Sequence, residues 1–343
     1  MTRVAIGAIM KDEGPYILEW VAYHKSLGFK LIIADHGGGD ETSKILTFLH
    51  NAGVIYRIDF RFKKKLPQIP AYRAILHRAR KSGIDIIGFL DCDEFFTKTI
   101  PISSLSPSDG AAHIESEFKR LNATQISYHW LLYGSKTYSE DEKIPVLQRF
   151  SHHSHWQTKE NRMVKSFILV KEMFKLKNLF FFSPKIVTSH NFHGANRRWI
   201  IDDDLVKKFD INTQHATHQN GAILHYIIKT WDEYQRKVNR GRALIGNTRY
   251  TAEFFRKNDL NEIYSPIPDS LIIELTHKID DLNILIGNYS LQEVEPNFLT
   301  DVKVWVNSLG FSDIANHKFL FTIYKIVKEI RRYFAEETKS RTG

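Results

Sequence analysis

The first hundred residues alternate between two hydrophobic periodicities, and this alternation limits the possible folds more than any other feature of the chain. Short apolar or β-branched runs of strand length occur at residues 4–9, 30–34, 54–60 and 84–90. Amphipathic helical patterns lie between them, at residues 16–27, 41–51 and 71–82. Because strands and helices in this rhythm form βαβ units, we predict an α/β fold with a mainly parallel central sheet flanked by helices.

The composition is that of an ordinary globular protein. The 343 residues are 43% hydrophobic and 13% aromatic, which is enough to bury a large core. The chain has no uninterrupted run of about 18 apolar residues, and its first residues lack the pattern of a signal peptide, so we predict a cytoplasmic protein. Its single cysteine, Cys92, cannot form an intramolecular disulfide, which agrees with a reducing compartment.

The net charge of +9 favours a polyanionic partner, which could be a nucleic acid, a phospholipid surface or a phosphorylated small molecule. Basic residues cluster at 61–65 and at 318–341, and most of them are expected to be solvated surface charges. The clusters are not accompanied by a nucleic-acid-binding motif. We therefore expect no nucleic acid partner, and keep a basic nucleic-acid-binding protein only as a minor alternative.

Polar loops follow three of the predicted strands, at residues 11–15, 35–40 and 91–94. The middle loop contains three consecutive glycines, which would let a ligand approach the backbone closely. In open α/β sheets, ligands bind beyond the carboxyl ends of the strands. The sequence therefore predicts a ligand site at this edge of the sheet.

Three carboxylates occupy four positions at the end of the fourth predicted strand: Asp91, Asp93 and Glu94. In an extended chain residues i and i+2 point the same way, so we expect Asp91 and Asp93 to project together while Cys92 turns back. Paired carboxylates are hard oxygen ligands that suit Mg²⁺ or Mn²⁺. A capping role is the alternative for any one of these acids, but three together favour a functional site.

Five segments resemble, in order, the pattern of the bacterial family 2-like and family 92-like glycosyltransferases. Residues 11–28 resemble the family's stretch of K-N-E, E-W-x-x-(Y/H)-H and L-G, and residues 35–40 resemble its D-N-x-S-x-D loop. Residues 89–95 resemble its D-x-D-E-F strand end. Residues 128–135 resemble its (N/H)-W-x-x-(F/Y)-G-S stretch, and residues 224–241 resemble its segment of H-Y-x-x-K-S and R-G. The sequence departs from this pattern at Asp12, where Asn is usual, and at residues 36–38, where N-x-S is usual. The matches extend over about residues 3–242 and are specific as a set.

The resemblance implies a GT-A nucleotide-sugar transferase that uses Mn²⁺ or Mg²⁺, with uridine diphosphate as the carrier. The resemblance implies Asp93 as the direct metal ligand, with His225 as a further ligand and Asp91 facing either the ribose or the metal. Lys229 would face the diphosphate. The residues implied to line the nucleotide pocket are Glu13, Asp35 and His36.

The residues themselves suggest further roles. A bound metal and a cation such as Lys229 would stabilise the charge that develops on the leaving β-phosphate. In an inverting reaction a carboxylate removes the acceptor proton, and the candidates are Asp203 and Asp204, although residues 202–204 are equally typical of a helix N-terminus. Arg73 could reach a phosphate or base, and Gln68 could contribute to the same pocket. Lys165 is interpreted as a charge flanking a strand, with a place facing the acceptor as the minority alternative.

We predict two parts of the chain: a catalytic domain at residues 1–242, with a nucleotide-sugar half at about 1–100 and an acceptor half at about 101–242, and a helical extension at residues 243–343. Helical patterns in the extension occur at residues 271–285, 301–309 and 316–337. The last is basic and amphipathic, so it either packs on the catalytic domain or lies on an anionic membrane leaflet. Membrane contact would suit a transferase that elaborates a lipid-linked saccharide in lipopolysaccharide or cell-surface polysaccharide synthesis.

A second enzyme class stays open. Paired carboxylates with a divalent ion also serve phosphoryl chemistry, so a nucleotidyltransferase or a phosphohydrolase on a similar sheet would carry the same acidic strand end. Its product would be a nucleoside monophosphate or free phosphate, whereas a sugar transferase of the kind described above releases a nucleoside diphosphate.

Overall fold

The computed structural model describes residues 2–60, 67–100, 109–174, 199–201, 204–205, 215–240 and 251–294. The chain divides into two compact units, Met1–Gly287 and Asn288–Gly343, and the fold below is that of the first. The first unit therefore ends later in the chain than the catalytic domain that we predict at residues 1–242. The predicted helices at 301–309 and 316–337 lie outside the described residues.

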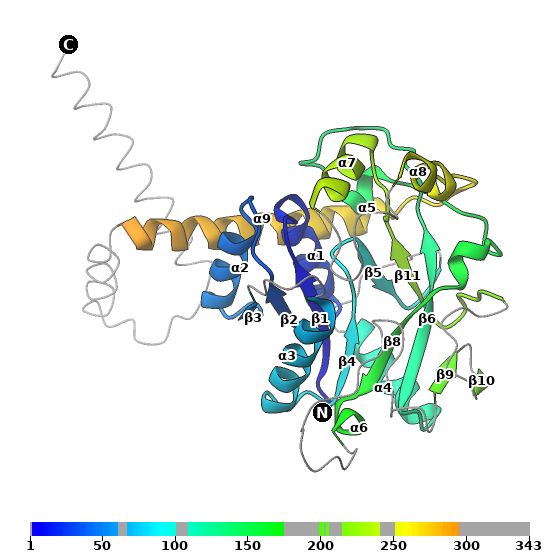
Figure 1. The fold of residues 1–343 in the computed structure, drawn as a ribbon, viewed down its shortest axis with the longest axis horizontal. Coiled ribbons are helices and arrows are strands. Elements are labelled where there is room, and N and C mark those ends of the chain that lie inside the picture. Colours follow the sequence, from blue (N-terminus) through cyan, green and yellow to red (C-terminus); the bar gives the residue numbers. More distant parts are fainter. Residues whose placement is uncertain are drawn as a thin grey trace. The chain divides into compact units, whose positions relative to one another are not determined.

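The N-terminal part of this unit is the predicted alternation of strands and helices. Its strands β1 (Val4–Met10), β2 (Lys30–Asp35), β3 (Tyr56–Asp59) and β4 (Ile86–Phe89) pair in parallel, in the order β3-β2-β1-β4 (Figure 1). They are connected by α1 (Gly14–Ser26), α2 (Thr42–Asn51) and α3 (Gln68–Lys81). Each predicted element is present, and its ends differ from the prediction by a few residues.

The strands that follow run in both directions. β8 (Val164–Leu169) is antiparallel to both β4 and β6 (Gln125–Leu132). β6 pairs in parallel with β9 (Trp199–Ile201) and with β11 (Ala222–His225). β10 (Asp204–Leu205) is antiparallel to β9, and β5 (Glu94–Thr97) is antiparallel to β11. The sheet, in the order β10-β9-β6-β8-β4-β1-β2-β3, is thus parallel at its N-terminal strands and mixed elsewhere.

The other elements of the described residues are mostly short. They are α4 (Asp109–Arg120), α5 (Val146–Arg149), β7 (His152–His153), a 3₁₀ turn (Lys159–Arg162), α6 (Val170–Met173), α7 (Trp231–Arg240), α8 (Ala252–Asn258), β12 (Ile263–Tyr264) and α9 (Asp269–Val294). None of the helices found in these ranges is long and apolar enough to cross a lipid bilayer.

The alternation of side chains along β1 explains how helices cover both faces of the sheet. One set packs into the core that contains α1 and α2, and consists of Val4, Ile6, Ala8 and Met10. Ala5 belongs to the opposite core, which contains α3. At Gly7 a methyl group would lie 2.7 Å from Cγ2 of Ile75 and 2.8 Å from the ring of Phe89. Glycine here lets α3 pack closely on the sheet.

Residues after 250 complete this first unit. β12 pairs with β7, and the side chain of Asp259 accepts a hydrogen bond from the backbone N–H of Ser135 at 2.7 Å. At the start of α9, Leu271, Ile272 and Leu275 are buried in the core, a spacing that places them on one helix face. The segment 251–287 is therefore packed into the same core as the N-terminal strands.

Candidate active site

The acidic segment at the end of β4 forms a tight turn that leads into β5. The backbone N–H of Glu94 donates to the carbonyl oxygen of Asp91 at 3.0 Å, which closes a four-residue turn. The extended conformation that we expect at Asp91 and Asp93 is therefore wrong, because this segment is a turn, although the charge of Asp93 still acts on Asp91. Cys92 does turn back into the core, where its side chain is buried.

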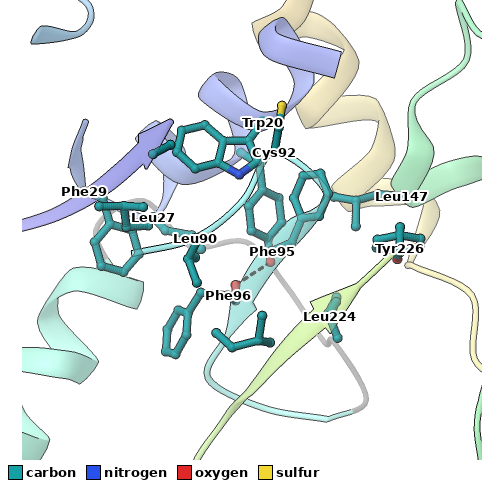
Figure 2. Packing of buried hydrophobic residues seen from close by; sticks show 14 of the residues in the cluster. Trp20, Leu27, Phe29, Leu90, Cys92, Phe95, Phe96, Leu147, Leu224 and Tyr226 are labelled. Carbon is teal, nitrogen blue, oxygen red and sulfur yellow. Dashed lines mark hydrogen bonds between the residues drawn. The ribbon is translucent and has the colours of Figure 1, made fainter. Parts of the chain in front are cut away.

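Side chains of helix α1 hold this turn in place through hydrogen bonds. Nε1 of Trp20 donates to the carbonyl oxygens of both Asp91 and Glu94, each at 3.0 Å. The hydroxyl of Tyr23 donates to the carbonyl oxygen of Phe96 at 2.8 Å. Figure 2 shows Trp20 next to Cys92, with Phe96 in the same apolar cluster. The E-W-x-x-Y-H stretch of α1 thus positions the acidic turn and does not itself face a ligand.

Lys165 on β8 lies under the turn. Its Nζ is 2.9 Å from Oδ2 of Asp91 and 2.9 Å from Oε2 of Glu94, and the residue is 1% exposed. Burial lowers the pKa of Lys165, but the two carboxylates outweigh it and hold the pKa well above its usual range. Burial raises the pKa of Glu94 to about 8, and Lys165 opposes that rise. Lys165 is therefore part of the acidic site, and our interpretation of it as a strand-flanking charge is wrong.

Asp93 meets two other groups. It forms an ion pair with Lys237 of α7, and its Oδ1 lies 3.7 Å from Nε2 of His225 at the end of β11. Burial raises the pKa of Asp93, yet Lys237 and His225 bring it well below the usual range. Burial lowers the pKa of His225, and the neighbouring Asp93 opposes that effect. Sequence reasoning missed Lys237, although it lies one helical turn from Tyr234 in a segment that carries the resemblance.

Helix α7 also contacts the loop after β1. Arg240 pairs with the carboxylate of Glu13 and donates to the carbonyl oxygen of Lys11 at 3.1 Å. Burial raises the pKa of Glu13, against the opposing effect of Arg240. Glu13 is thereby brought to the same site as Asp93, whose charge also acts on it.

Lys229 lies just before α7, in the left-handed backbone region with φ 58°. It is buried, and its ammonium group sits 4.2 Å from the centre of the Tyr16 ring. Burial lowers the pKa of Lys229, and the nearby Asp93 opposes that effect. Within the described ranges, Lys229 has neither a hydrogen bond nor an ion pair. Its ammonium group therefore keeps hydrogen-bond donors for an anion.

The loop after β2 is held by Asp35. One carboxylate oxygen of this fully buried residue accepts from Nε and Nη2 of Arg57, at 2.8 and 2.6 Å. The other accepts from the hydroxyl of Ser43 and from the backbone N–H of Gly37, both at 2.9 Å. His36, next in the chain, is half-buried with its ring 6.4 Å from that of Phe60. In the structure the Asp35 carboxylate thus orders the glycine-rich loop.

The other predicted site residues lie further from the acidic turn, or are not among the residues that the structure describes. Gln68 is buried and donates to the hydroxyl of Tyr72 at 3.0 Å, while Arg73 is exposed on α3. Asp204 lies on β10, three strands from β8, which is about 14 Å at the usual strand spacing. Asp203 is outside the described residues. The structure thus brings together Glu13, Asp91, Asp93, His225 and Lys229, but not Arg73 or Asp204.

The acidic turn has the donor chemistry for a divalent ion. In the described part of the chain, no group of three or more His, Cys, Asp and Glu side chains is arranged to hold a metal ion as it stands. The donor chemistry nevertheless fits Mg²⁺ or Mn²⁺: Asp91 is 45% exposed, and Asp93 faces His225 at a distance too long for a hydrogen bond. Two buried atoms here, Oε1 of Glu94 and Nδ1 of His225, also have no hydrogen-bond partner among the residues that the structure describes.

The described residues thus place an acidic turn and the buried Lys229 at the carboxyl edge of an α/β sheet. The family model of glycosyltransferase family 92 matches residues 10–263, and the chain belongs to this family. No curated protein matches the chain.

Several solved structures are similar to parts of the chain. The crystal structure of S. aureus TarS 1–349 is 9% identical with a TM-score of 0.32, over 50% of this chain and 48% of that one. TarS 1–349 in complex with UDP-GlcNAc is 8% identical with a TM-score of 0.34, over 63% of this chain and 62% of that one. A197 from STIV is 13% identical with a TM-score of 0.25, over 52% of this chain and 71% of that one. The chain thus spans about half to two thirds of the TarS chains that it matches.

Proposed function

We propose that this glycosyltransferase moves a sugar from a nucleoside diphosphate sugar, with uridine diphosphate as the carrier, to a saccharide or a lipid-linked saccharide, and that it requires Mn²⁺ or Mg²⁺. The observation that carries the proposal is Lys229. Its side chain is buried, and its ammonium group lies near Glu13 and Asp93 but has neither a hydrogen bond nor an ion pair within the described residues. Burying a cation in this way costs free energy unless an anion binds to it and neutralises its charge.

The acidic turn would hold the metal beside that anion. Asp91 and Asp93 would bind the ion together with His225, whose neutral imidazole is a suitable ligand. When bound, the ion supplies stabilisation of the negative charge on the leaving diphosphate. Lys229 would donate to the same phosphate oxygens, so that it stabilises the charge as it develops.

Further residues are proposed on weaker support. For the nucleotide pocket they are Glu13, Asp35, His36, Gln68 and Arg73. Of these, Glu13 and His36 lie in loops at the carboxyl edge of the sheet, and Asp35 is the last residue of β2. For the base of an inverting reaction they are Asp203 and Asp204.

Calorimetric titration with nucleoside diphosphates and nucleotide sugars tests the donor class, first with Mn²⁺ and then with a chelator. We expect one nucleotide family to bind, and the chelator to abolish binding. Asp93→Asn should lose metal-dependent binding, whereas Glu117→Gln, which removes a carboxylate on α4 paired with Arg120, should bind as the wild type does. If a nucleoside monophosphate or free phosphate is the product of turnover, the transferase assignment fails in favour of phosphoryl chemistry.

Contact with a membrane is a separate part of the proposal. It rests on the basic amphipathic pattern of residues 316–337, which lie outside the described residues. With this helix on the cytoplasmic leaflet, the enzyme would reach a lipid-linked acceptor. Sedimentation with anionic liposomes should be lost when residues 316–343 are deleted, and unchanged sedimentation would remove the membrane from the proposal.

A further inference from the structure

Glu94 is the carboxylate of the acidic turn to which the proposed function gives no role. It is fully buried, and one of its oxygens is already used: Oε2 accepts from Nζ of Lys165 at 2.9 Å and from the backbone N–H of Asp91 at 2.8 Å. The other oxygen, Oε1, is buried and has no hydrogen-bond partner in the described residues. An unsatisfied buried acceptor is rare and unfavourable, so this oxygen requires an explanation.

The group that faces Oε1 is His225. The two residues are direct neighbours across the antiparallel pair of β5 and β11, so the sheet register fixes their proximity. Nδ1 of His225 lies 3.9 Å from Oε1, and it too is buried without a hydrogen-bond partner in these ranges. A shift of about 1 Å would bring the two atoms to hydrogen-bond distance. An acceptor and a possible donor, each unsatisfied, therefore face one another.

The remaining contacts of His225 limit how its ring can turn. The ring packs edge-on against Trp130 with 4.3 Å between the ring centroids, and Nε2 points toward Oδ1 of Asp93 at 3.7 Å. The two ring nitrogens thus have different neighbours: Glu94 at Nδ1 and the metal-binding side of the turn at Nε2. Which nitrogen carries the proton then decides whether Nε2 can act as a ligand.

We propose that Glu94 is a positioning residue that keeps the proton of His225 on Nδ1, so that the lone pair of Nε2 is free for the divalent ion beside Asp93. Lys165 serves this arrangement by occupying the other oxygen of Glu94. A histidine that binds a metal commonly donates its second nitrogen to a carboxylate, which orients the ring and selects the tautomer. This inference rests on the metal requirement of the proposed function, and it adds a residue whose effect on that ion is indirect.

Glu94→Gln makes the proposal sharply testable. The amide oxygen of Gln would take the place of Oε2, because that position accepts from both Lys165 and the backbone of Asp91. The amide NH₂ would then face Nδ1 of His225 and donate to it, which moves the ring proton to Nε2. We expect ¹⁵N NMR of labelled histidine at pH 8.5, without metal, to give the Nδ1–H tautomer for His225 in the wild type and the Nε2–H tautomer in Glu94→Gln.

The consequence for the ion is measured by titrating Mn²⁺ into each protein by calorimetry. We expect affinity to fall about 10–100-fold in Glu94→Gln. Glu94→Asp, which keeps the charge beside Lys165 but draws the carboxylate away from Nδ1, should also bind Mn²⁺ less tightly. The matched control is Glu117→Gln, which should equal the wild type, and the melting temperature of each variant verifies that it is folded.

Two results would overturn this role for Glu94 while leaving the transferase intact. One is unchanged Mn²⁺ affinity in both folded Glu94 variants. The other is a wild-type His225 that carries its proton on Nε2. If the wild type binds nucleotide but no Mn²⁺, the metal requirement fails and the role of Glu94 falls with it. If it binds neither, the donor class itself is wrong.

Discussion

At the scale of single residues, Lys229 holds a position that is unfavourable without a ligand. Its backbone is left-handed, its side chain is buried, and its ammonium group lies over the ring of Tyr16. A residue keeps such a conformation when contacts with the surrounding structure hold it in place, and such residues are frequent at ligand sites. The same reasoning distinguishes Lys229 from Lys165 and Lys237, which already neutralise carboxylates of the acidic turn.

We predict that Lys229→Met weakens the binding of a nucleoside diphosphate by about 10–100-fold, because a charge-assisted hydrogen bond contributes about 1.5–3 kcal/mol. Methionine keeps the apolar contact with Tyr16, so the fold and Mn²⁺ binding without nucleotide should be retained. Calorimetry with and without nucleotide measures both. Lys257→Met on α8, whose side chain is 66% exposed, controls for the loss of one positive charge. Equal nucleotide affinity in Lys229→Met would remove this residue from the diphosphate site.

Glu233 provides a prediction about pH. It is buried in an ion pair with Arg149, at 2.7 Å, and accepts from the hydroxyl of Thr230 at 2.7 Å. Burial raises the pKa of Glu233, but Arg149 and its other partners bring it down to about 2 from a usual value of 4.5. A carboxyl whose pKa is lower in the folded state stabilises the fold above pH 4.5, and that stabilisation is lost as the pH falls toward 2.

Glu233→Gln should therefore be less stable than the wild type at pH 7, by about 3–5 kcal/mol, since Arg149 is left buried without its partner. The variant should also lose less stability on acidification, because its side chain does not titrate. Urea unfolding between pH 7 and pH 3 measures both effects. Glu253→Gln, at an exposed position of α8, should follow the wild-type profile. Parallel pH profiles for Glu233→Gln and the wild type would contradict the prediction.

At the scale of elements, α1 acts as a support for the acidic turn. Trp20→Phe keeps an aromatic ring in the core but removes the indole N–H that donates to the carbonyl oxygens of Asp91 and Glu94. We expect a loss of about 1–3 kcal/mol in the free energy of unfolding and weaker Mn²⁺ binding. Chemical unfolding and calorimetry measure the two effects. Unchanged Mn²⁺ affinity in a destabilised variant would show that α1 supports the core alone and not the geometry of the turn.

The elements were predictable to different degrees, for physical reasons. The strands and helices before residue 90 follow from local periodicity, and so does the position of the polar loops at the carboxyl edge of the sheet. The side chains that contact the turn do not follow from local periodicity, because Lys165 lies 74 residues from Asp91, and Lys237 lies 144 residues from Asp93. Contacts at that separation depend on sheet register and helix docking, which no local pattern in a single sequence contains. The turn does not follow from the sequence pattern either, because the alternation of side chains in a strand holds only as far as the last paired residue of β4, and Asp91 and Asp93 lie beyond it.

At the scale of the whole chain, two boundaries for the catalytic unit can be compared: residue 242, from the change in sequence pattern, and Gly287, from the contacts of the structure. Residues between them supply β12 and the buried side chains Leu271, Ile272 and Leu275. Burying three such side chains contributes about 5–8 kcal/mol, which is as large as the net stability of many domains. The two boundaries therefore differ in what they predict for truncated proteins.

A protein that ends at residue 287 should fold and bind nucleoside diphosphate with Mn²⁺, because it keeps the strand pair β7–β12 and the packed start of α9. A protein that ends at residue 242 should lose its cooperative melting transition, since the core residues that face α9 become exposed. Circular dichroism on heating and calorimetric titration test both. If the shorter protein melts cooperatively and binds nucleotide as tightly as the longer one, then residues 251–287 are an accessory to the fold, and the boundary drawn from the sequence is the functional one.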